Sequence, residues 1–186
     1  MVLIAEKMSV QRTKNTIEEL PKEFIYIEKI FSEMDSFKIS EPIIELESAE
    51  YGACTFTLND LHILFRTAKI TPTKTGQFVT VWKRINKGPI QPFESSDPID
   101  FFIISVRKDD DFGLFIFPKS VLVDKKIVSD KKEGKRAIRV YPPWDITTSK
   151  QAQKTQKWQL DYFLEIPQNQ INDLNRIKLL SLLNPN

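Results

Sequence analysis

One nearly unbroken apolar run limits the folds that this chain can adopt. Residues 101–106 read FFIISV, and a cluster of three aspartates at 109–111 separates them from a second apolar run, GLFIF, at 113–117. A strand with one face in water alternates apolar and polar residues. A short continuous apolar run bounded by turn signals is instead typical of a strand buried on both faces. The sequence therefore predicts a sheet whose central strands are covered on both sides.

The other segments follow the order helix, strands, helices. Residues 18–35 carry apolar side chains at helical spacing, and residues 149–164 and 167–183 are predicted as two closing helices. Strand patterns recur between residues 45 and 141, and residues 61–70 and 77–84 are expected to pair as a hairpin across a loop containing Pro and Gly. This order indicates one α+β domain over residues 1–186, with a central mixed, mostly antiparallel sheet at 45–141. The helix at 18–35 and the helices at 149–183 should flank that sheet.

Cysteine and histidine are scarce, and this excludes several kinds of site. The single cysteine, Cys54, excludes an internal disulfide, and with one histidine, His62, most Cys- or His-based metal sites are excluded as well. We interpret Cys54 as a small buried residue of a strand, the alternative being a nucleophile paired with His62. The sequence shows no secretion signal and no apolar run long enough for a membrane span, so we expect a cytoplasmic protein with no membrane partner.

Charge is segregated along the chain, although the net charge is only +2. Residues 17–50 contain ten acidic residues against three lysines, whereas residues 61–93 contain no acidic residue. A second basic region extends from Lys125 to Lys157. Such segregation can create a positive face that attracts polyanions. The alternative is that the acidic segment packs beside the basic one and neutralises it.

The basic hairpin is the main candidate for a binding site. Lysines, threonine hydroxyls and loop amides together suit the oxygens of phosphates, so the sequence predicts contacts with a nucleic-acid backbone. The predicted phosphate-binding residues are Arg66, Lys69, Lys74, Lys83, Arg84, Arg136, Arg139, Lys154 and Lys157. Trp144, which follows two prolines, is a candidate for stacking on a base. The alternative for the hairpin and for the lysines of the helix at 149–164 is an ordinary solvated surface.

A catalytic centre is not expected. Metal-dependent nucleases commonly combine carboxylates that hold magnesium with a nearby lysine. Here Lys83 could serve as the lysine, but Val81, two residues earlier, cannot bind a metal. If the chain were active, Asp60, Glu50 and Lys83 would be the candidates, and magnesium would be the cofactor. Otherwise we expect neither a metal nor a cofactor.

Four blocks of sequence resemble the MepB family. They are residues 65–84 (FRTAKITPTKTGQFVTVWKR), 112–119 (FGLFIFPK), 134–145 (GKRAIRVYPPWD) and 151–158 (QAQKTQKW). The resemblance extends from about residue 20 to residue 163. It implies a bacterial protein encoded beside a MarR-type repressor and a multidrug efflux pump. It also implies a fold similar to the PD-(D/E)xK restriction endonucleases, in which Val81, Trp82 and Lys83 occupy the acid-any-lysine positions with the acid missing.

The sequence thus predicts a non-catalytic protein that binds nucleic acid, with DNA favoured over RNA as the partner. One alternative is a magnesium-dependent nuclease with an atypical site. Another is an accessory protein of drug resistance that binds a small molecule in a closed pocket lined by Phe and Trp.

Overall fold

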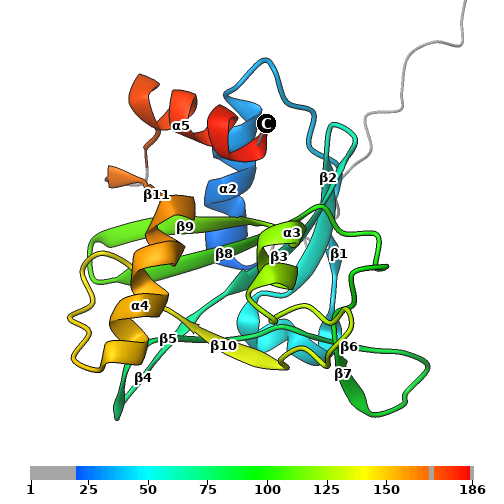
Figure 1. Ribbon diagram of the computed structural model, residues 1–186. Coiled ribbons are helices and arrows are strands. Elements are labelled where there is room, and N and C mark those ends of the chain that lie inside the picture. The colour runs from blue at the N-terminus through cyan, green and yellow to red at the C-terminus, as the bar shows by residue number, and fades with distance from the viewer. Residues whose placement is uncertain (1–19, 168–169, 185–186) are drawn as a thin grey trace, which may run out of the picture.

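A six-stranded sheet organises the chain (Figure 1). The computed structural model describes residues 20–167 and 170–184. The strand order is β1-β2-β3-β8-β9-β11, and every neighbouring pair is antiparallel except β3 and β8, which are parallel. The strands are β1 (Ile43–Ile44), β2 (Cys54–Leu58), β3 (Leu61–Thr67), β8 (Phe101–Lys108), β9 (Asp111–Pro118) and β11 (Phe163–Glu165). The predicted α+β fold with a mixed, mostly antiparallel sheet is confirmed.

The apolar run at 101–106 forms the middle of this sheet. It lies in β8, which pairs with β3 on one side and β9 on the other, and all six residues are buried. Successive side chains of a strand point to opposite faces. Accordingly, Phe101 and Ile103 belong to one hydrophobic cluster, and Phe102 and Ile104 to a second. The hydroxyl of Ser105, the one polar residue of the run, donates a hydrogen bond to Thr67 Oγ1.

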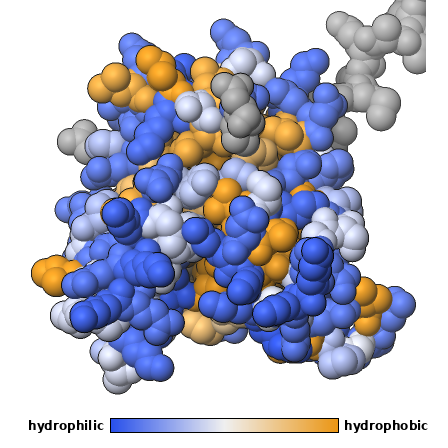
Figure 2. All heavy atoms as spheres, viewed as in Figure 1, coloured by the Kyte–Doolittle hydropathy of each residue, from blue (hydrophilic) through white to orange (hydrophobic). Residues whose placement is uncertain are grey.

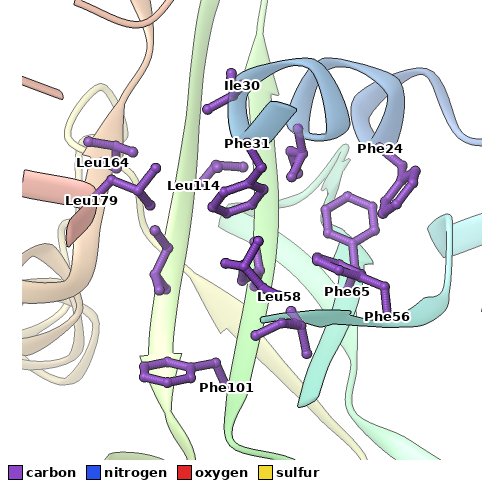
Figure 3. Packing of buried hydrophobic residues seen from close by; sticks show 14 of the residues in the cluster. Phe24, Ile30, Phe31, Phe56, Leu58, Phe65, Phe101, Leu114, Leu164 and Leu179 are labelled. Atoms are coloured by element: carbon purple, nitrogen blue, oxygen red, sulfur yellow. The ribbon is translucent and has the colours of Figure 1, made fainter. Parts of the chain in front are cut away.

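Two helices cover one face of the sheet. Helix α2 (Lys22–Ser32) places Phe24 and Phe31 among the strands, and helix α5 (Asp173–Leu183) adds Leu179 beside them (Figure 3). The ring of Phe24 meets Phe56 and Phe65 edge to face, at centroid distances of 5.3 and 5.7 Å. Such aromatic pairs add stabilisation beyond the burial of their area. Phe24, Phe56 and Phe65 therefore join α2 to the sheet.

The opposite face is covered by a second, three-stranded sheet and two helices. This sheet has the order β10-β5-β4, and a separate pair, β6 with β7, continues beyond it. The elements are β4 (Lys69–Thr71), β5 (Lys74–Thr80), β6 (Trp82–Arg84), β7 (Ile90–Pro92), β10 (Ala137–Val140), α3 (Lys119–Asp124) and α4 (Lys150–Gln159). The buried side chain of Gln159 accepts a hydrogen bond from the Tyr141 amide and donates one to the Arg139 carbonyl, so it fixes α4 against the end of β10.

Three features differ from the sequence predictions. The expected 61–70 strand ends at Thr67 and joins the central sheet, and only the short β4 forms a hairpin with β5. The expected helix at 149–164 ends at Gln159, where a 3₁₀ turn (Leu160–Tyr162) leads into β11. Phe163 and Leu164 are adjacent and both buried, one in each hydrophobic cluster, which suits a strand between two layers and not one face of a helix. Helix α3 was not predicted.

At the N-terminus, α2 begins at Lys22 and ends at Ser32, inside the predicted range 18–35, while residues 18 and 19 lie outside the described residues. Within the described part of the chain, no helix has both the length and the apolar character needed to cross a membrane.

Candidate functional site

The predicted phosphate contacts separate into two groups in the structure, and the first group is already paired with carboxylates. Arg66 lies in β3 with a side chain that is only 1% exposed. Its Nη2 atom donates to Glu45 Oε2 at 2.6 Å, and its Nη1 atom donates to the Phe65 carbonyl at 2.8 Å. Burial lowers the pKa of the Arg66 guanidinium, and Glu45 opposes that effect. Because Arg66 has almost no surface, it does not contribute to an exposed phosphate-binding surface in this structure.

Lys83 in β6 is held by two acids. Its Nζ atom lies 2.5 Å from Asp97 Oδ1 and 3.2 Å from Glu94 Oε2, and its side chain is 15% exposed. Burial alone would lower the pKa of Lys83, but the hydrogen bonds to Asp97 and Glu94 outweigh it and the pKa is raised. Lys83 therefore joins β6 to the loop that precedes β8 and has little surface left for a ligand.

Arg84 and Lys69 are neutralised by the acidic segment around the 3₁₀ turn Leu46–Tyr51. Arg84 Nε lies 2.5 Å from Glu47 Oε2, and its Nη1 atom donates to the Gly88 carbonyl. Lys69 Nζ lies 2.9 Å from Glu50 Oε2 and 4.4 Å from the centre of the Tyr51 ring. Together with Arg66 and Glu45, these pairs show that acidic residues 45–50 pack against the basic strands. For this part of the hairpin, neutralisation describes the structure better than a free positive face.

A second set of cations, which includes the predicted Lys74 and Arg139, surrounds a cleft of about 490 Å³ between α4 and the strands β10 and β5. Lys74, Lys125, Lys135 and Arg139 contribute to its lining, and no Asp or Glu is among the described residues that line it. None of these four cations takes part in an ion pair within the described chain. Figure 2 shows hydrophilic residues over the region of α4, at the lower left of the view, whereas apolar residues gather at the top over α5. The cleft is therefore a concave, cationic surface.

Helix α4, including its N-terminus, forms one wall of this cleft. Ser149, at the N-cap, accepts a hydrogen bond from the Ala152 amide, and Ser149, Ala152 and Thr155 line the cleft. The first amides of a helix have no partners within the helix, and the helix dipole favours negative charge at this end. No acidic residue occupies the first turn of α4. The backbone thus adds to the positive potential of the lysines.

Arg139 acts within the cleft by positioning its neighbours. Its Nη1 atom donates to the carbonyls of Gly76 at 2.7 Å and Lys74 at 3.3 Å, and its Nη2 atom donates to Thr71 Oγ1 at 2.8 Å. These bonds fix the tip of the β4–β5 hairpin, which carries Lys74. Arg139 therefore belongs to the candidate site as a positioning residue.

The remaining predicted cations lie at the edges of the cleft. Lys154 and Lys157 are exposed on a neighbouring face of α4 and form no ion pair among the described residues. Arg136 is also exposed, but its Nη2 atom lies 2.8 Å from Glu133 Oε1 and its Nε atom donates to the Ile90 carbonyl. Lys154 and Lys157 can extend a phosphate footprint, whereas Arg136 is partly neutralised.

Trp144 is half-buried between the core and a hollow beside the cleft that Lys74 also lines. Its ring meets Phe163 edge to face at 5.6 Å, and its Nε1 atom is buried without a hydrogen-bond partner. Trp158, by contrast, packs on Phe117 at 5.4 Å, and Lys125 Nζ lies 5.3 Å from its ring centre. Trp144 thus remains a candidate for contact with a base, and Trp158 supports the wall of the cleft.

The residues proposed for catalysis are not brought together. Lys83 pairs with Asp97 and Glu94, Glu50 pairs with Lys69, and Asp60 lies in the turn between β2 and β3. Val81 is buried. Among the described residues, no group of three His, Cys, Asp or Glu side chains could hold a metal ion.

Cys54 is fully buried in the core, as predicted, and burial raises the pKa of its thiol to about 12. His62 instead lies beside Asp100, with Nδ1 at 3.5 Å from Oδ2. A Cys54 nucleophile paired with His62 is therefore not formed.

A separate hollow of about 340 Å³ lies between β1, β2 and β3 and the loop before β8. Its lining is mostly apolar and includes Phe56, Phe93 and the exposed Ile43, with no tryptophan among the described lining residues. It differs from the closed pocket of Phe and Trp that a small-molecule accessory would need.

Sequence reasoning did not select several residues of the cleft. Lys125 and Lys135 belong to the second basic region but were not chosen, because nothing local shows that the loop before β10 folds towards α4. Tyr141 and Gln159 also line the cleft, and Gln159 could have been found as a polar residue on the apolar face of an amphipathic helix.

Comparisons with known proteins agree with this architecture. A family model described as MepB-like matches residues 45–165. A solved structure described as "Crystal Structure of MepB" is 37% identical in sequence, with a TM-score of 0.68, over 78% of this chain and 97% of that chain. No match was found among curated proteins.

Proposed function

The chain belongs to the MepB-like family, and we propose that it binds the phosphate backbone of a nucleic acid without cutting it. DNA is favoured over RNA as the partner. The cationic cleft between α4 and the strands β10 and β5 is the proposed contact surface, with Lys154 and Lys157 extending it along α4. This proposal moves the centre of binding from the basic hairpin to the cleft.

One observation carries the proposal, namely that the cations of the cleft have no carboxylate partners within the described part of the chain. Lys74, Lys125 and Lys135 line one concave surface without an acidic residue among its described lining, beside the N-terminus of α4. Unpaired cations in a concave surface attract counter-ions, and a polyanion that displaces several small ions at once gains affinity from their release. Lysines, serine and threonine hydroxyls and helix amides are also the groups that commonly contact phosphates.

The geometry around Lys83 supports binding without hydrolysis. In the restriction-endonuclease-like scaffold that the family resemblance implies, Val81 stands where a metal-binding acid would be. Val81 is buried, and the Lys83 ammonium is occupied by Asp97 and Glu94. A lysine in two ion pairs is poorly placed to polarise an attacking water. The link to multidrug resistance comes from the same resemblance and is part of this proposal.

The test is fluorescence anisotropy with labelled single- and double-stranded DNA and RNA at several salt concentrations, with and without magnesium. We expect binding that weakens steeply with salt, and an intact probe after incubation. Absence of binding at low salt would refute the proposal. Cleavage that depends on magnesium would refute its non-catalytic part and support the alternative of a magnesium-dependent nuclease with an atypical site. The variant Lys178→Gln, which also removes one positive charge, is the control and should leave binding unchanged. Lys178 is exposed on α5, in the layer of the molecule opposite the cleft.

A further inference from the structure

A second hollow, of about 290 Å³, lies beside the cleft, and Lys74 lines both. Its other lining residues include Ile70 from β4, Lys108 from the end of β8, and Trp144, Asp145 and Ile146 from the loop before α4. Gly76 also lines it and packs closely against Tyr141 of the cleft, since a Cβ atom there would lie 2.5 Å from Tyr141 Cε1, and its φ of +85° also favours glycine. The hollow and the cleft are therefore neighbours divided by a thin wall.

The walls of this hollow combine apolar surface with unpaired cations. Ile70 and Ile146 are 59% and 84% exposed, an unusual position for large apolar side chains, and the ring of Trp144 adds a flat surface. Lys74 and Lys108 are exposed and take part in no ion pair among the described residues. Flat aromatic and apolar walls flanked by cations are the features with which proteins hold the bases of single strands.

Two residues that line the hollow also carry buried hydrogen-bonding atoms that have no partner within the described chain. Asp145 Oδ2 and Trp144 Nε1 are both buried without a partner within the described chain. Burial raises the pKa of Asp145, and the nearby Lys108 opposes that effect. Buried polar groups in folded proteins nearly always have partners, so two unsatisfied groups at one hollow call for an explanation. A ligand that carries both a donor and an acceptor would supply it.

From these observations we infer that this hollow receives one unpaired nucleobase of a strand whose phosphates occupy the cleft. The inference rests on the proposed function and narrows it to single-stranded or locally opened nucleic acid. The volume of about 290 Å³ lies just below the range of pockets for drug-sized ligands, about 300 to 1,000 Å³, which suits one ring system better than a base pair.

The Asp145 carboxylate accepts from an amino group of the base, which favours cytosine over thymine. Cytosine presents an exocyclic amino group, whereas thymine presents carbonyl oxygens on either side of its single ring N–H. The carbonyl oxygens would repel a carboxylate. Lys74, between the two hollows, contacts the phosphate that joins this base to the rest of the strand.

The experiment compares three labelled single strands of equal length and charge, namely all-cytosine, all-thymine and abasic, and a duplex of the cytosine strand, which carries twice the charge. We expect the cytosine strand to bind about tenfold more tightly than the abasic strand, since stacking and hydrogen bonding of one base are lost. The thymine strand should be intermediate and the duplex weak. Equal affinity for all four would refute the base pocket and leave the phosphate cleft standing. Absence of binding by any strand at low salt would refute the proposed function itself.

Two variants sharpen the test. Asp145→Asn should weaken binding of the cytosine strand about tenfold and remove its advantage over thymine, without changing the salt slope. If only phosphates bound here, the same variant would tighten binding, because it removes a negative charge beside them. Ile146→Ser, at a side chain too exposed to support the fold, should reduce the cytosine affinity severalfold and spare the abasic strand. Asp35→Asn, in the exposed loop after α2, is the matched control and should change neither.

Discussion

Two basic regions of this protein have similar compositions and opposite surroundings. Around β3, β4 and β6, the cations Arg66, Lys69, Lys83 and Arg84 each lie within 3.2 Å of a carboxylate oxygen. Around α4 and β10, the cleft cations Lys74, Lys125 and Lys135 have no such partner among the described residues. In sequence the first region stands out because residues 61–93 contain no acidic residue at all. A cationic stretch is therefore available to bind anions only where the fold leaves its charges unpaired.

The largest expected effect is a loss of stability in the paired region that leaves the affinity for nucleic acid unchanged. Arg66→Met removes one partner of a buried ion pair and leaves Glu45 without its hydrogen bond, so the free energy of unfolding should fall by about 3 kcal/mol. Urea denaturation measures this change. Affinity for nucleic acid, corrected for the folded fraction, should stay the same. A stable variant with weakened binding would mean that Arg66 reaches the ligand and that the comparison fails.

A smaller loss of stability is expected at the boundary between the two regions. Arg139→Met removes the hydrogen bonds that fix Thr71, Lys74 and Gly76, which should lower the free energy of unfolding by about 2 kcal/mol. Because its donors are already used, the salt dependence of binding should change less than in Lys125→Gln. Denaturation and salt titration of both variants check this. If Arg139→Met and Lys125→Gln changed the salt slope equally, Arg139 would have to contact a phosphate directly.

The smallest expected effect tests whether ion pairing alone prevents the cations of the first region from binding nucleic acid. Glu47→Gln removes the carboxylate that holds Arg84, and an exposed ion pair of this kind contributes about 0 to 1 kcal/mol to stability. The fold should tolerate the change, while the freed Arg84 should raise nucleic-acid affinity about twofold at low salt. Anisotropy titration measures the gain. Weaker binding would show that Glu47 has a role other than neutralisation.

The sequence predicted the layers of the fold better than the location of the site. The apolar run at 101–106, the α2 spacing and the order of elements are local signals, and each corresponds to a buried face in the structure. Arg66 is different, because its partner Glu45 is 21 residues away and only the folded sheet brings them together. The end of α4 was also missed, since Phe163 and Leu164 continue an apolar pattern that tertiary pairing with β9 turns into a strand.

The residues that line the cleft are separated by even longer stretches of sequence. Lys74 and Lys135 are separated by some sixty residues, and they line the same cleft because β5 pairs with β10. Acids at 45–50 were recognised as possible neutralising partners of the basic segment, but charge counts alone could not show which cations they would reach. Ion-pair geometry decides this, and it is a property of the tertiary structure.

Two double variants with equal loss of charge test the central claim most directly. Lys125→Gln with Lys135→Gln removes two cleft cations, and Lys69→Gln with Arg84→Gln removes two paired ones. The measurement is the slope of log affinity against log salt concentration for the same labelled strand. The cleft variant should reduce the slope by about 1.4 to 1.8, the value for two lost phosphate contacts, while the paired variant should leave it unchanged. The reverse result, or equal slopes in both variants, would contradict the cleft as the nucleic-acid binding surface.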